Sequence, residues 1–174
     1  MKILDEIGNN MEAKIKITTI QTDYKGKSIF ERMADELCIT ETFSNMDESG
    51  VIETSLTGNI DIVDEKYILS YEETEASGME GVKTELSFNE STPREICLAR
   101  SGEMSSTMYF NEGKRDICVY NTGIMPFEIC VYTRSIDNRL IEDGYLEIIY
   151  IIEIKGACAQ KTVLRMETKK YDRS

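Results

Sequence analysis

The sequence contains no histidine and no tryptophan, and only 2 of its 174 residues are proline. The absence of histidine removes the commonest metal ligand and the commonest general base near neutral pH. No apolar run approaches the roughly 20 residues that a membrane-spanning helix needs. The amino-terminal stretch offers only Ile3 and Leu4 where a signal peptide needs a longer apolar region. We therefore expect a cytoplasmic protein with no metal and no cofactor.

Positive charge is also scarce, because 20 lysines and arginines face 32 aspartates and glutamates and leave a formal net charge of -12. A surface of this sign repels polyphosphate and anionic lipid head groups, so we expect no nucleic-acid partner and no membrane partner. The five cysteines lie far apart, form no Cys-x-x-Cys pair and are odd in number. We interpret them as reduced thiols, as is usual inside the cell.

The clearest structural signal lies in residues 66–88, which we interpret as two strands joined by a turn. Side chains of 82–88 alternate between apolar and polar, which is the pattern of a half-buried antiparallel strand. Residues 67–71 show a weaker alternation before the chain becomes acidic. Gly78 and Gly81 allow the backbone angles that a turn between such strands requires.

Short strand-like segments separated by turn residues recur along most of the chain. We expect strands at 11–22, 51–57, 59–63, 66–75, 82–88, 94–100, 104–110, 117–122, 127–134, 145–154 and 160–168. Gly58 is expected to mark a bulge or bend, and residues 138–144 a loop. A Ser-x-x-Glu capping box beginning at Ser28 predicts a short helix over 29–38.

About ten strands with hairpin connections favour a closed antiparallel barrel, because closure removes the exposed edges of a flat sheet. The sequence therefore predicts an all-β protein with one short helix near its amino terminus. We expect residues 1–174 to form a single domain with flexible polar tails at 1–10 and 169–174.

Arg100 is the most informative candidate for a binding site. It has the same strand parity as Ile96 and Leu98, so an inward-facing Ile96 would carry the guanidinium into the barrel. There it would need a carboxylate or a ligand anion, and we expect Glu72 as its partner. Alternatively, the strand ends before Arg100 and the side chain pairs at the rim.

Three tyrosines, Tyr71, Tyr120 and Tyr150, are candidates for the lining of the same cavity, and Tyr132 is a further candidate. Their rings offer apolar area and their hydroxyls a polar group, although ordinary core tyrosines have the same pattern. Glu73 and Glu75 would share a strand face at a spacing of about 7 Å, near that of paired catalytic carboxylates. Because acids are abundant here, we interpret this pair as a solvated strand end and expect no enzymatic activity.

Four blocks of the chain carry a family resemblance: SYEETEASGMEGVKTELSF (70–88), ARSGEMSSTMYFNEGK (99–114), VYNTGIMPFEICVYT (119–133) and GYLEIIYIIEIKG (144–156). In this order and spacing they resemble the YwiB-like family of Gram-positive bacteria, small cytoplasmic proteins with no assigned activity. The family pattern falls on Tyr71, Glu72, Glu73, Gly78, Met79, Glu80, Gly81, Thr84, Arg100, Gly102, Met108, Phe110, Tyr120, Thr133 and Tyr150.

The resemblance implies a calycin-like, lipocalin-like β-barrel, and it supplies no reaction. This chain departs from the pattern at residues 28–50, where relatives are shorter, and at residues 121–124. We expect a module that binds a small ligand with an anionic or carbonyl group, held by Arg100 and the three tyrosines with Glu72 beside them. The alternative is a protein-interaction or structural module, such as a homodimer, without a small-molecule ligand.

Overall fold

The computed structural model describes residues 10–23, 47–124, 126–154 and 157–170, and these residues form ten strands and one 3-10 turn. The turn is η3 (Glu75–Ser77). The strands are β1 (Met11–Asp23), β2 (Asp47–Val63), β3 (Lys66–Glu72), β4 (Lys83–Asn89), β5 (Thr92–Ser101), β6 (Ser106–Asn111), β7 (Arg115–Asn121), β8 (Pro126–Arg139), β9 (Tyr145–Ile154) and β10 (Ala157–Lys170).

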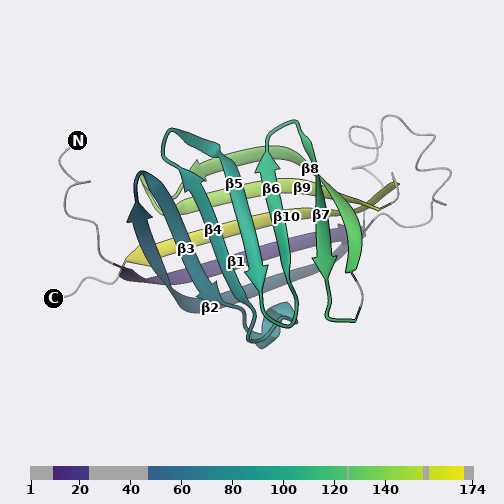
Figure 1. The fold of residues 1–174 in the computed structure, drawn as a ribbon, viewed down its shortest axis with the longest axis horizontal. Helices are drawn as coiled ribbons and strands as arrows, with labels where there is room; N and C mark the ends of the chain where they lie inside the picture. The colour runs from purple at the N-terminus through teal and green to yellow at the C-terminus, as the bar shows by residue number, and fades with distance from the viewer. Residues whose placement is uncertain (1–9, 24–46, 125, 155–156, 171–174) are drawn as a thin grey trace.

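All ten strands belong to one antiparallel sheet in the order β6-β5-β4-β3-β2-β1-β10-β9-β8-β7. Strands β3 to β7 pass in front of β8, β9, β10, β1 and β2 and run across them, so the sheet curls back on itself (Figure 1). Its two end strands, β6 and β7, meet at a single bridge, in which Ser105 and Asn121 exchange two backbone hydrogen bonds of 2.9 Å. The predicted ten-stranded antiparallel barrel is confirmed, and this one bridge nearly closes it.

Several predicted boundaries change. The strand expected to end at Glu75 ends at Glu72 and is followed by η3. β8 continues through Arg139, where a loop was expected from Asn138, and β10 continues through Lys170 into the expected tail. These extensions follow from pairing, since both segments have partners in β9 or β1 despite their polar sequences. The helix expected at 29–38 lies outside the described residues.

Gly58 was expected to separate two strands, but β2 is one continuous strand that includes Gly58. A Cβ atom at this position would lie 2.5 Å from the Ser70 carbonyl oxygen and 2.5 Å from Cδ1 of Ile15. The glycine therefore permits close contact between neighbouring strands and does not interrupt the strand.

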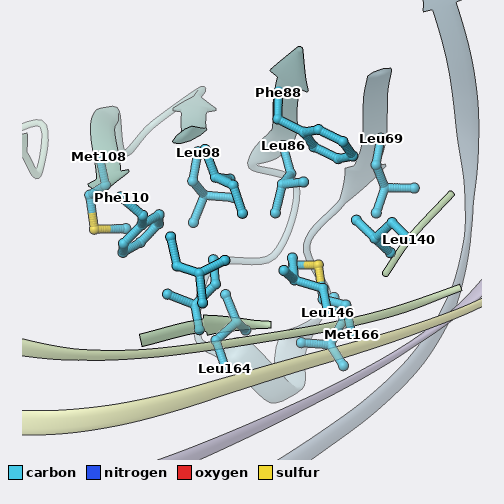
Figure 2. Close-up of a cluster of buried hydrophobic side chains, with 14 of the residues drawn as sticks. Leu69, Leu86, Phe88, Leu98, Met108, Phe110, Leu140, Leu146, Leu164 and Met166 are labelled. Carbon is cyan, nitrogen blue, oxygen red and sulfur yellow. The ribbon is translucent and has the colours of Figure 1, made fainter. Parts of the chain in front are cut away.

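The interior is filled by side chains from both layers of the barrel. Figure 2 shows Leu69, Leu86 and Leu98 pointing from the front strands toward Leu146 and Met166 on the strands behind. All five are less than 2 % exposed. Their burial follows from the alternation seen in the sequence, since each strand turns its apolar face to the same interior.

Replacing Gly58 by alanine should lower the free energy of unfolding by about 2 kcal/mol or more, because the new methyl group meets backbone as well as a side chain. Gly50→Ala is the matched control, since a Cβ on this other β2 glycine meets no atom within 4 Å. Urea unfolding followed by circular dichroism measures both. Equal stability of the two variants would contradict the close packing at Gly58.

Candidate functional site

The register of β3 to β6 arranges the interior side chains in rows across the strands. One row is aliphatic and consists of Leu69, Leu86, Leu98 and Met108. The next row, two residues along each strand, is polar and consists of Tyr71, Thr84, Arg100 and Ser106. The interior therefore changes from apolar to polar toward one end of the barrel.

A cavity of about 430 Å³ lies at this end of the barrel. The polar row contributes Tyr71 and Arg100 to its wall, and Glu73, Tyr120 and Tyr150 join them. Most of the remaining wall is apolar and comprises Ile17, Ile52, Met79, Met108, Ile129, Ile152, Ile154 and Leu164. Further polar side chains in the wall are Thr19, Gln21, Thr54, Ser77 and Gln160. The cavity thus combines a largely apolar surface with polar side chains, as ligand sites commonly do.

Arg100 lies in the cavity wall beside a buried carboxylate. Its Nε is 3.5 Å from Oε1 of Glu73, and the two side chains are only 14 % and 6 % exposed. The hydroxyl of Thr84 donates a 2.7 Å hydrogen bond to the same carboxylate oxygen. The alternative in which Arg100 pairs at a solvated rim is therefore wrong.

The backbone fixes the position of Glu73. Its N–H donates to the Val82 carbonyl at 2.8 Å, and its carbonyl accepts from the Gly81 N–H at 3.2 Å. Gly78 and Gly81 take positive φ angles of 73° and 82°, which confirms the turn expected from these glycines. The connection between β3 and β4 thus holds Glu73 against Arg100 at the end of the barrel.

The expected pairing of Arg100 with Glu72 is wrong, because Glu72 is exposed and lies on the outer face of β3. Tyr71 is buried, and the residue with the same parity is Glu73, which extends the inner face by one more position. Glu73 and Glu75 do not form a pair on one strand face, since Glu75 is exposed in η3. Arg100, Tyr71, Tyr120 and Tyr150 line the cavity as predicted, whereas Tyr132 does not line it.

The electrostatic environment keeps Tyr71 and Tyr150 neutral and Arg100 charged. Burial raises the pKa of Tyr71, and the nearby Glu73 carboxylate raises it further. Burial also raises the pKa of Tyr150. Burial by itself would lower the pKa of Arg100, but the surrounding tyrosines and Glu73 outweigh it and the pKa rises. The cavity therefore presents a guanidinium cation and neutral tyrosine hydroxyls.

Buried polar atoms without a protein hydrogen-bond partner gather around this cavity. They include Nε of Arg100 and the hydroxyl of Thr54, which line it. The hydroxyl of Ser106, opposite Arg100, also lacks a partner. Native proteins leave few such atoms, so these are positions where ordered water or another molecule would supply the partners.

Two charged side chains lie in the wall of the cavity. Glu73 and Arg100 are the only charged side chains that the described part of the chain contributes to the wall. Within that part, no three histidine, cysteine or acidic side chains converge on a metal position.

None of the described segments forms a helix with the length and apolar character needed to cross a bilayer.

Glu73 was considered only as one of a carboxylate pair and interpreted as solvated, and Ser106 and Thr54 were not foreseen as site residues. Strand parity could have found Glu73, since it follows Tyr71 by two positions. Ser106 could be found only from the register that places it opposite Arg100. Thr54 is far from Arg100 in the sequence, and only the curvature of the barrel brings β2 to the same cavity.

Replacing Arg100 by methionine should lower the free energy of unfolding by about 3 kcal/mol, because it leaves the buried Glu73 carboxylate without its counter-charge. Adding Glu73→Leu should recover most of that loss, giving a coupling of about 2 kcal/mol in a double-mutant cycle. Urea unfolding monitored by circular dichroism provides the values.

The control for this cycle is Arg94, whose ion pair with Glu112 is 4.0 Å long and well exposed, at 71 % and 43 %. Arg94→Met should change stability by less than about 0.5 kcal/mol. Strictly additive effects of Arg100→Met and Glu73→Leu would show that the two side chains are not coupled.

Comparison with known proteins agrees with this fold. The solved structure of the ywiB protein from Bacillus subtilis is similar with a TM-score of 0.65 and 19% sequence identity, covering 95% of this chain and 96% of that one. No curated protein matches the sequence. Residues 38–166 match the family model described as a domain of unknown function, DUF1934. The chain therefore belongs to the DUF1934 family, which confirms the YwiB-like resemblance seen in the sequence.

Proposed function

We propose that this protein is a binding module that holds one small amphipathic molecule in the cavity of its barrel. Arg100 would contact an oxygen atom in the head of that molecule, while the apolar wall would enclose its body. The observation that carries the proposal is the inward guanidinium, whose Nε has no hydrogen-bond partner within the protein although it is buried beside a cavity of about 430 Å³.

The size and lining of the cavity support this function. Its volume falls in the range of about 300 to 1,000 Å³ that small-molecule sites occupy. Tyr71, Tyr120 and Tyr150 add rings for apolar contact and hydroxyls for hydrogen bonding at the same end as Arg100. Ile154 lines the cavity and is 41% exposed, so it marks the opening toward solvent.

Binding without catalysis is also part of the proposal. The carboxylate in the wall, Glu73, is already engaged by Arg100 and Thr84, so it is poorly placed to act as a general base. The cellular compartment we propose is the cytoplasm. Cys97, Cys118 and Cys130 are free thiols, which supports a reducing environment.

A fluorescence titration with the neutral dye N-phenyl-1-naphthylamine tests this function. The dye should brighten on binding, and Ile52→Trp, which fills the cavity, should weaken its binding at least about tenfold. Val51→Trp is the matched control, because Val51 is the preceding residue on β2 and is 59% exposed. Native mass spectrometry of protein from its own host should show a bound small molecule.

Unchanged dye binding by the Ile52→Trp variant, or no dye binding to the unaltered protein, would overturn the proposed use of the cavity. Circular dichroism of both tryptophan variants checks that the barrel remains folded. Any loss of binding can then be assigned to the filled cavity.

A second candidate function is self-association through the seam between β6 and β7. The outer face of β7 exposes Ile117 and Val119 at 61% and 56%, and Tyr109 on β6 is 54% exposed. Apart from the single bridge at Ser105, the facing edges of β6 and β7 have no ladder of backbone hydrogen bonds between them. An open edge pairs most simply with the same edge of a second copy, related by a twofold axis.

Sedimentation velocity distinguishes this candidate. A dimer that forms through the seam should dissociate to monomer in the Ile117→Lys variant, because a charged side chain would replace an apolar contact. Val63→Lys is the control, since Val63 is similarly exposed, at 54%, and lies on β2. A monomer at all concentrations, or a dimer unaffected by Ile117→Lys, would reject it.

A further inference from the structure

The charged part of the cavity wall is electrically balanced. Among the described residues, Arg100 brings one positive charge and Glu73 one negative charge. The whole chain has a formal net charge of -12, so distant groups do not restore a positive field for an anion. A ligand entering this site therefore meets the N–H donors of the Arg100 guanidinium in a site that has no net positive charge.

We infer that Glu73 makes the site select ligands with a neutral oxygen acceptor, such as an amide, ester or ketone, over ligands with a carboxylate. The inference rests on the proposed binding function and specifies the chemical class of the head group. The expectation drawn from Arg100 alone allowed a ligand with either an anionic or a carbonyl group. The presence of Glu73 favours the neutral carbonyl group.

The geometry disfavours a second carboxylate. A carboxylate in contact with the Arg100 guanidinium would lie within a few ångströms of Glu73, whose Oε1 is 3.5 Å from Nε of Arg100. Both side chains are largely buried, so water screens this repulsion poorly. A neutral carbonyl oxygen can accept from the guanidinium without that repulsion.

Glu73 is also unable to swing aside easily when a ligand enters. Its carboxylate accepts from the hydroxyl of Thr84 at 2.7 Å, and its backbone is bonded to Gly81 and Val82 across the turn. A guanidinium has five N–H donors in a planar fork, so donors remain for a ligand while Glu73 stays in place. The fixed carboxylate of Glu73 therefore disfavours ligands whose head group carries a negative charge.

The test compares decanamide with decanoate, two molecules with the same apolar chain and different head-group charge, by displacement of N-phenyl-1-naphthylamine at pH 7.5. The unaltered protein should bind decanamide at least about tenfold more tightly than decanoate. The Glu73→Gln variant should shift the ratio of the two affinities at least about tenfold toward decanoate, because Arg100 then lacks its compensating carboxylate.

Glu72→Gln is the matched control, since it removes the same charge from the neighbouring, exposed residue. It should leave the ratio within about twofold of that of the unaltered protein. Circular dichroism confirms folding of both variants, and the comparison in the unaltered protein needs no variant at all.

The two proposals fail in different ways. If neither decanamide nor the dye binds the unaltered protein, the proposed binding function is overturned. If the dye binds but decanoate binds as tightly as decanamide, or Glu73→Gln leaves the ratio unchanged, the binding function stands and the selectivity is overturned.

Discussion

A guanidinium buried in an apolar barrel needs a counter-charge, and this requirement governs the end of the structure where the cavity lies. Arg100 projects inward because it continues the face on which Ile96 and Leu98 lie. An unpaired charge there would cost several kcal/mol, so its presence depends on Glu73 at 3.5 Å. The pair is balanced in charge but incomplete in hydrogen bonding, since Nε of Arg100 has no partner within the protein.

The position of Glu73 depends in turn on the connection between β3 and β4. Gly78 and Gly81 adopt left-handed backbone angles there, and the turn they form bonds Glu73 to Val82. The same short segment brings Met79 to the cavity wall. One local stretch, residues 70–88, therefore provides the turn, the counter-charge and part of the apolar lining. The pattern of glycine and acid in this segment therefore corresponds to a turn that borders the cavity.

Much of the barrel could be predicted because alternation is a local property. The parity of Tyr71, Thr84 and Arg100 identified the inner faces of three strands correctly. The pairing of those strands could not be deduced from parity, so the row that joins the three residues was not foreseen. Glu72 was expected as the partner of Arg100 because Glu73 and Glu75 were interpreted as the solvated end of the strand. In fact the inner face continues for one more position.

Side chains alternate between the inside and the outside along every strand, at both ends of the barrel. One end is hollow and the other is packed because the inward side chains differ. Leu86 and Leu98 fill the interior where their row meets the opposite layer, as Figure 2 shows. One row further, Thr84 is smaller than leucine, and the Arg100 side chain turns toward Glu73 in the wall. Space remains because Thr84 and Ser106 are shorter than Leu86 and Met108 in the preceding row, and because Arg100 lies against Glu73 in the wall. The Thr84 hydrogen bond and the Arg100 ion pair hold the Glu73 carboxylate in place, so this part of the cavity wall is fixed by contacts within the protein.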